Sequence, residues 1–333
     1  MTGLISANPL RVYARRLKQQ SIFYRPGTES NIFLFAQRRG GSTILAQAIA
    51  SESGIWFANE PLACFRGHQE YQTRIKWLPL LPDSQFFDLS QEQERQLERY
   101  LEALLTLNLR QVGKCFRPKF PLTANRVLLK VLNAPFLIDW FAQRQPCQVL
   151  FMPRHPAAQV FSVLSTQWKF SLATYFAKPE FLAQYFTAAQ IQLGEKMIKE
   201  GNSWQQGIVT WILEVYFPLY LAKQKILRLT YEELTLDPVT VLNRISQELN
   251  LKQTDKIIDR MKRPSWSSII STESSRQLVQ KGDRNGIIRK WQEQITPEQI
   301  RQAQSILEVF NIDIYSMDDP MPKPKYLINT INP

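Results

Sequence analysis

The chain has 333 residues, of which 44% are hydrophobic and 21% are charged. Its aromatic content of 11% excludes a disordered chain, and its 12 glycines are too few for a collagen-like or low-complexity one. The 41 Lys and Arg residues exceed the 29 Asp and Glu residues, so the surface attracts anions such as nucleic acid, phosphorylated ligands or acidic lipid headgroups. Scattered cysteines (Cys64, Cys115, Cys147) and two histidines (His68, His155) exclude a disulfide scaffold, a thiolate zinc site and a His-rich metal centre.

Short apolar runs alternate with segments of helical periodicity along the chain. This pattern predicts an α/β fold with a central, mostly parallel sheet and helices on both faces. The runs expected to form buried strands are Ile32–Phe35, Ile55–Ala58, Val127–Leu132, Val149–Met152 and Ile226–Leu229. Capping boxes predict helix starts after Ser90 and after Thr296, where Pro297 occupies the first helical position.

We expect a single domain with its core at about residues 30–312, a basic extension at 1–29 and a Pro-rich tail at 313–333. Its last stretch, residues 318–333, is expected to be extended or loosely docked. Residues 1–20 have no apolar core of signal-peptide length, and Glu214 and Pro218 interrupt the most apolar window, 208–222. These features favour a cytoplasmic protein with no membrane span.

Residues 166–221 read as irregular helices with many aromatic residues. An aromatic stripe at helical spacing is most often ordinary core, and a helical cap over a substrate pocket is the alternative. The aromatic residues concerned are Trp168, Phe170, Tyr175, Phe176, Phe181, Tyr185 and Phe186.

The first motif, Arg38-Arg39-Gly40-Gly41-Ser42-Thr43, joins a buried strand to an apolar-periodic helix. Glycines let the backbone turn so that several N–H groups point into one concavity, and the following helix adds its positive dipole end. The segment therefore predicts a phosphate or sulfate site at the end of a central strand. It lacks the lysine of the nucleotide triphosphatase loop, and the alternative is an ordinary strand–helix turn with solvated arginines.

The second motif is Arg154-His155-Pro156, which again follows a strand, with Ser162 further along the predicted helix. The spacing from Arg154 to Ser162 corresponds to about two helical turns, so both side chains could face one anion. Arginine suits a phosphate because it donates two parallel hydrogen bonds. The alternative is an arginine that satisfies the C-terminus of a helix.

Together the two motifs resemble the sulfotransferases that use 3′-phosphoadenosine 5′-phosphosulfate (PAPS). Residues 39–43 resemble the 5′-phosphosulfate loop of that family, and residues 154–156 with Ser162 resemble its 3′-phosphate motif. Residues 231–238 and 281–298 resemble two further family segments, in the family's order. The resemblance covers about residues 30 to 312 and implies the sulfotransferase fold, with an inserted helical substrate region.

The resemblance implies a role for each matching residue, with PAPS as the sulfonate donor and no metal. Arg39 would stabilise charge on the leaving phosphate, Arg154 and Ser162 would bind the 3′-phosphate, and Tyr231 would approach the adenine. The residues implied to cradle the 5′-phosphate are Gly40, Gly41, Ser42 and Thr43, and those implied to close over the 3′-phosphate are Lys281 and Gly282.

Three positions depart from the family pattern. Arg38 stands where the family usually has proline, and Gly40 stands where it has serine, which removes one hydroxyl from the loop. Leu132 stands where cytosolic members have the catalytic histidine of a Lys-x-His pattern, here Lys130-Val131-Leu132. The general base is therefore expected elsewhere.

Glu60 is the favoured base. It lies in Trp56-Phe57-Ala58-Asn59-Glu60-Pro61-Leu62, which resembles the Glu-Pro-Leu segment of carbohydrate-type sulfotransferases. A carboxylate within hydrogen-bond reach could take the proton of an attacking hydroxyl. His68 is the second candidate, and the structural alternative is that Glu60 caps or salt-bridges a neighbouring turn.

The sequence thus predicts transfer of a sulfonate onto a hydroxyl, less readily an amine, of a small-molecule or sugar acceptor, as in the tailoring of secondary metabolites. Two other classes are open. A kinase-like phosphoryl transferase would need a loop lysine and magnesium-binding carboxylates. A nucleic-acid-binding protein would need clustered basic residues, whereas here they are spread along the chain, so no nucleic acid is expected.

Overall fold

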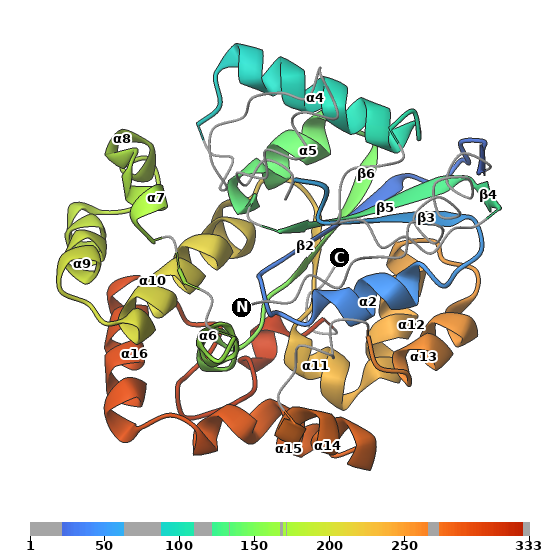
Figure 1. Cartoon of the computed structure of the whole chain (residues 1–333). Helices are drawn as coiled ribbons and strands as arrows, with labels where there is room; N and C mark the ends of the chain where they lie inside the picture. Colours follow the sequence, from blue (N-terminus) through green and yellow to red (C-terminus); the bar gives the residue numbers. More distant parts are fainter. Residues whose placement is uncertain are drawn as a thin grey trace, which may run out of the picture.

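The computed structural model describes residues 22–62, 88–109, 122–132, 134–166, 169–170, 172–265 and 273–328. Within this part of the chain, five parallel strands form one sheet in the order β3-β5-β2-β6-β7 (Figure 1). Their bounds are β2 Asn31–Ala36, β3 Ile55–Asn59, β5 Arg126–Leu132, β6 Cys147–Met152 and β7 Ile226–Arg228. All the predicted strands are present, and the α/β prediction is confirmed.

Strand β2 lies at the centre of the sheet, between β5 and β6. The chain moves from β2 to β3 on one side, and later to β6 and β7 on the other. The carboxyl end of β2 is therefore a topological switch point, where open parallel sheets bind their ligands. The short strands β1 Phe23–Tyr24 and β4 Thr123–Ala124 pair with each other apart from this sheet.

Alternate residues of the strands enter two separate cores, one on each face of the sheet. Phe33 and Phe35 of β2 join one core, whereas Ile32 and Leu34 join the other. The first face is covered by α4 Gln91–Leu105, α5 Ile138–Arg144 and α10 Ser203–Tyr216, and α16 Pro297–Val309 packs on α10 (Figure 1). The second face is covered by α2 Ser42–Ile49, α12 Pro238–Glu248 and α13 Thr254–Met261.

The predicted capping boxes are confirmed at Ser90, before α4, and at Thr296, before α16. The other helices are α6 Pro156–Leu164, α7 Leu172–Phe176, α8 Pro179–Leu182, α9 Ala188–Lys199, α11 Tyr231–Leu236, α14 Glu273–Lys281 and α15 Arg284–Arg289. Short 3-10 or π turns complete the described elements at η2 Pro135–Leu137, η3 Phe217–Leu221, η5 Lys290–Glu293 and η6 Pro324–Tyr326. None of the described helices is long and apolar enough to cross a membrane.

The aromatic residues of the helical region belong mainly to the core. Tyr175 and Phe186 are buried, and Phe181 and Tyr185 pack edge-on or tilted against Phe136. This arrangement supports the core interpretation of the aromatic stripe for the residues that the structure describes, whereas Trp168 lies outside them.

Residues 313–328 pack against the domain, and the expectation of a loosely docked last stretch is wrong at Ile328, which joins the second core and donates its N–H to Glu233 Oε1 at 2.7 Å. Ile314, Tyr315, Met317 and Ile328 are each no more than 2% exposed. The Tyr315 hydroxyl donates to Glu232 Oε2 at 2.7 Å. The proline content of this segment suggested an extended chain. Its apolar residues nevertheless join both cores, and the hydrophobic gain from burying them holds the segment against the domain.

Candidate functional site

The glycine-containing loop follows β2 at the switch point and leads into α2. Gly41 caps this helix with φ +81°, a left-handed conformation that suits glycine. A Cβ at this position would lie 2.3 Å from Cδ2 of Tyr231, so the ring of Tyr231 packs against the loop itself. No acidic side chain lies in the first turn of α2, which leaves the positive end of the helix open to an anion.

The two sequence motifs meet at this loop. Arg154 Nη1 donates to the carbonyl oxygen of Arg39 at 2.9 Å, and Arg39 Nε donates to Ser162 Oγ at 3.1 Å. The guanidinium of Arg154 also lies 4.5 Å from the centre of the Tyr231 ring. Residues far apart in the sequence are thus joined in one contact network around the loop, in which Ser162 bonds to Arg39.

Basic side chains accumulate beside the loop. Burial, followed by the charge of Arg154, lowers the pKa of Arg39. Burial and then Arg154 also lower the pKa of Lys290, with a partly opposing effect of Glu293. Arg154 Nε is buried and has no hydrogen-bond partner. Arg154 thus disfavours the charged form of two neighbouring cations and has an unused donor of its own; such a cluster suits an anion that carries several charges, and PAPS has this chemistry.

Lys290 was not singled out by the sequence analysis, whereas Lys281 was. Lys281 is exposed at the end of α14, and Gly282 follows it with φ +68° and open space around its Cα. The basic group whose pKa responds to Arg154 is Lys290, in η5. The basic run Arg289-Lys290 before Trp291 was visible in the sequence, but only the fold shows which basic residue approaches Arg154.

Glu60 follows β3 at the same edge of the sheet. Its Oε1 accepts a hydrogen bond at 2.9 Å from Lys130 Nζ, which also donates to Thr43 Oγ1 and to Asn59 Oδ1 at 3.1 Å each. The Lys130 side chain is 3% exposed and that of Glu60 is 28% exposed. The salt bridge expected as the structural alternative is thus present, and it also ties Glu60 to the loop through Thr43.

Lys130 was noted in the sequence only as part of a pattern that lacks its histidine. A lysine within the apolar run of β5 is buried, and a buried ammonium requires hydrogen-bond partners. The lysine in this run was therefore the feature of the sequence that indicated a polar site. Both Glu60 and Arg39 have a left-handed backbone, with φ of +54° and +63°. This conformation costs a non-glycine residue about 1–3 kcal/mol, and the described residues Asp88, Leu107, Asn250 and Asn311 adopt it as well. The second candidate base, His68, lies outside the described residues.

The fold and the loop define an α/β protein that binds an anionic ligand at the switch point of a parallel sheet. The sequence model of the sulfotransferase domain family matches residues 29–319, which is most of the chain. The chain therefore belongs to this family of PAPS-dependent enzymes, as the motifs predicted, and it is a sulfotransferase. This result decides against the kinase-like alternative.

Solved sulfotransferases are similar to the chain over most of its length. Mouse sulfotransferase SULT7A1 complexed with PAP is 18% identical, with a TM-score of 0.41 and coverage of 86% of each chain. The sulfotransferase domain from the curacin biosynthetic pathway is 15% identical, with a TM-score of 0.43 and coverage of 86% of this chain and 98% of that one. The domain from the Synechococcus PCC 7002 olefin synthase is 14% identical, with a TM-score of 0.36 and coverage of 85% and 97%. No curated protein sequence matches the chain.

Proposed function

We propose that this sulfotransferase transfers the sulfonate of PAPS to a hydroxyl group, less readily an amine, of a small molecule or a sugar. The observation that carries the proposal is the convergence of Arg39, Arg154 and Ser162 on the loop after β2, with Glu60 tied to the same loop through Lys130. The site therefore combines cations for a polyanionic donor with a carboxylate for the acceptor proton.

On the donor side, the roles are those that the family resemblance implies, and the charges and contacts of the site support them. Arg39 and the residues Gly40, Gly41, Ser42 and Thr43 hold the 5′-phosphate end, because helix-terminal N–H groups and a guanidinium stabilise negative charge there. Arg154, Ser162 and Lys290 hold the 3′-phosphate, and Lys281 with Gly282 closes over it. Tyr231, which packs on Gly41 and Arg154, faces the adenine. Bound PAPS supplies the sulfonate together with its leaving phosphate.

On the acceptor side, Glu60 takes the proton of the attacking hydroxyl at its carboxylate. The ammonium of Lys130, 2.9 Å from Glu60 Oε1, orients this carboxylate. Because the same ammonium bonds to Thr43, the base and the donor loop are held in a fixed relation.

Thermal unfolding with 3′-phosphoadenosine 5′-phosphate (PAP), AMP or ATP tests the donor assignment without any acceptor. A ligand at a hundredfold its Kd adds about 2.7 kcal/mol to the stability of the native state. We expect PAP to raise Tm by several degrees and AMP and ATP to have much smaller effects. Equal shifts with all three nucleotides would contradict the proposed 3′-phosphate site.

A further inference from the structure

The peptide group that joins Arg154 to His155 is held by side chains of two helices. Its carbonyl oxygen accepts a hydrogen bond from the indole Nε1 of Trp211, on α10, at 2.9 Å. Its N–H donates to Glu232 Oε1, on α11, at 3.0 Å. These partners lie 57 and 77 positions away along the chain, so tertiary packing fixes the backbone of Arg154 where β6 leads into α6.

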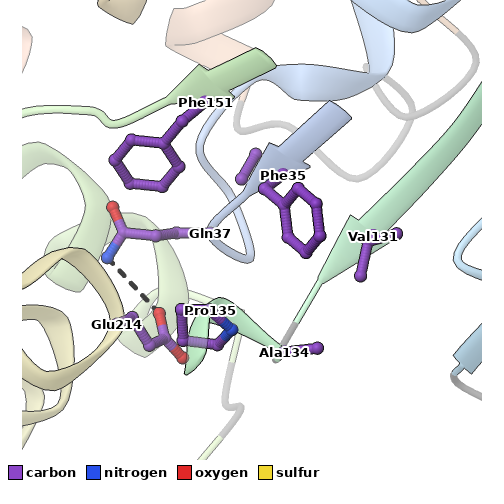
Figure 2. A pocket seen from close by; sticks show the side chains of 8 residues that line it. Phe35, Gln37, Val131, Ala134, Pro135, Phe151 and Glu214 are labelled. Atoms are coloured by element: carbon purple, nitrogen blue, oxygen red, sulfur yellow. Dashed lines mark hydrogen bonds between the residues drawn. The ribbon is translucent and has the colours of Figure 1, made fainter. Parts of the chain in front are cut away.

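The bond from Trp211 connects this peptide with the start of the donor loop. The backbone carbonyl of Trp211 accepts from Gln37 Nε2 at 3.4 Å, and the same nitrogen donates to Glu214 Oε2 at 3.3 Å. Figure 2 shows the amide of Gln37 directed at Glu214. The space beside these two side chains is about 10 Å³, enough for one water-sized group, so Gln37 has little room to move. Because Gln37 directly precedes the donor loop, α10 holds both this loop and Arg154.

The bond from Glu232 connects the same peptide with the C-terminal segment. Glu232 is 1% exposed, and its second oxygen, Oε2, accepts from the Tyr315 hydroxyl at 2.7 Å. A buried carboxylate is unfavourable without donors, and these two bonds supply one to each oxygen. The next residue, Ser316, accepts at its carbonyl oxygen from Nε2 of His155 at 3.1 Å. Tyr315 and Ser316 therefore brace His155, one through Glu232 and one directly.

Aromatic packing fixes the ring of His155 as well. The ring stacks on Trp291 with centres 4.2 Å apart and 15° between the planes, and the Tyr315 ring meets it edge-on at 5.0 Å. His155 is fully buried. A ring enclosed on these sides cannot shift without displacing the C-terminal segment, because packed interiors leave few gaps.

The guanidinium of Arg154 depends on this backbone for its place beside the donor loop. Its Nη1 donates to the carbonyl oxygen of Arg39, and it lies over the ring of Tyr231. Its Nε is buried and has no hydrogen-bond partner, so it has a donor left for an anion. A binding group has to be held within about 0.5 Å of its productive position, and a shift of the backbone at Arg154 would move the guanidinium away from it.

We propose that Glu232 and Tyr315 are positioning residues for the arginine that binds the 3′-phosphate. Tyr315 orients the carboxylate of Glu232, and this carboxylate fixes the peptide that follows Arg154. The C-terminal segment is thereby part of the donor site and contributes to the selection of a nucleotide with a 3′-phosphate. The inference rests on the proposed role of Arg154 and adds two residues that act through it.

The test is calorimetric titration of the full-length protein with PAP and with AMP, which lacks the 3′-phosphate. Glu232→Met keeps the length of the side chain and removes both acceptor oxygens. We expect it to lower the affinity for PAP about tenfold, as the loss of outer hydrogen-bond partners does at metal sites, and to change the affinity for AMP much less. Glu232→Gln retains an oxygen for the N–H of His155 and should restore most of the PAP-to-AMP affinity ratio.

Tyr315→Phe removes a single hydroxyl and should lower the PAP-to-AMP affinity ratio by a smaller factor, about threefold. It also carries the test should Glu232→Met fail to fold. Tyr326→Phe is the matched control, because Tyr326 lies in the same segment and its hydroxyl also donates to a carboxylate, that of Asp313. Asp313 bonds in turn to Lys325 and Tyr220. This control should keep the wild-type ratio even where its Tm is lower.

Equal losses of PAP and AMP affinity in Glu232→Met and Tyr315→Phe would overturn the inference, since a role in stability alone gives this result. An unchanged ratio in both variants, or an equal fall of the ratio in Tyr326→Phe, would overturn it as well. A ratio as low in Glu232→Gln as in Glu232→Met would contradict positioning through the acceptor oxygen. The donor assignment is judged separately, because its failure appears as wild-type protein that binds PAP no more tightly than AMP.

Discussion

The carboxyl edge of the sheet carries two chemically different regions. On the donor side, burial and then the charge of Arg154 lower the pKa of both Arg39 and Lys290, so Arg154 disfavours the charged form of each. On the other side, each carboxylate has donors from the protein: Glu60 is bonded to Lys130, and Glu214 is bonded to Gln37. Arg39 and Arg154 donate to a hydroxyl and to a backbone carbonyl, which are neutral partners, whereas the two carboxylates accept from an ammonium and an amide. Substitutions on the donor side should therefore change affinity, and those at Glu60 should change turnover.

The largest effect is expected for Glu60→Gln, which keeps the shape of the side chain and removes its basicity. Turnover should fall by about 10²- to 10⁴-fold, the usual contribution of general base catalysis. The affinity for PAP should stay within a few-fold of wild type, because Glu60 belongs to the carboxylate side. Steady-state kinetics with an accepted phenol or alcohol, together with calorimetric titration of PAP, separates the two quantities.

Glu298→Gln is the control for this substitution. Glu298 is an exposed glutamate that pairs with Arg301 on α16, far from the edge of the sheet in the sequence and in its contacts. Its substitution should leave both turnover and PAP affinity unchanged. Turnover near the wild-type value in Glu60→Gln would remove Glu60 as the base and direct attention to His68.

Arg154→Ala should produce the opposite result. The loss of charge-assisted hydrogen bonds, worth about 1.5–3 kcal/mol, should weaken PAP binding by about 10- to 100-fold. The Tyr231 ring also loses the guanidinium that stacks on it. Titration calorimetry with PAP measures the change, and AMP, which has no 3′-phosphate, should lose much less affinity. An equal loss for both nucleotides would mean that Arg154 supports the loop and does not bind the 3′-phosphate.

The next effect concerns His155, which adjoins Arg154 and stacks on Trp291 with ring centres 4.2 Å apart. Burial lowers the pKa of His155 to about 3, so the imidazole beside the cationic cluster stays neutral. In the unfolded chain its pKa is about 6.5, and there it takes up a proton as the pH falls. The free energy of unfolding should therefore decrease by about 1.4 kcal/mol per pH unit below pH ~6.5 on account of this residue.

Urea unfolding of wild type and His155→Phe at several pH values between 4 and 7 checks this dependence. Phenylalanine preserves a ring for Trp291 but does not titrate, so the difference between the two proteins isolates His155 from other groups such as Glu232. The unfolding free energy of wild type minus that of His155→Phe should decrease as the pH falls, because only wild type loses stability through this group. A constant difference would show that the imidazole is able to take up a proton in the folded state.

The sequence was sufficient for the sheet and for the donor loop, because both depend on local signals. Apolar runs mark the buried strands, and Gly41 with its neighbours marks the turn before α2. The contact between Gln37 and Glu214 could not be predicted from the sequence. These residues are 177 positions apart, and only the packing of α10 on the sheet brings them together. Glu214 in the sequence served only to exclude a membrane span. The tail was misjudged because its prolines outweighed, in composition, the few apolar residues that anchor it.

The smallest effect discriminates between two lysines of the C-terminal segment. Lys290 is half-buried and its pKa is lowered by burial and by Arg154, whereas Lys281 is exposed at the end of α14. A partly buried cation near a phosphate contributes more than a solvated one, because solvent screens it less. Lys290→Met should therefore weaken PAP binding several-fold, and Lys281→Met should weaken it less, with a loss that disappears at high salt. If Lys281→Met instead has the larger effect at every ionic strength, the segment around Gly282 closes over the 3′-phosphate when the nucleotide binds, and Lys290 has a supporting role.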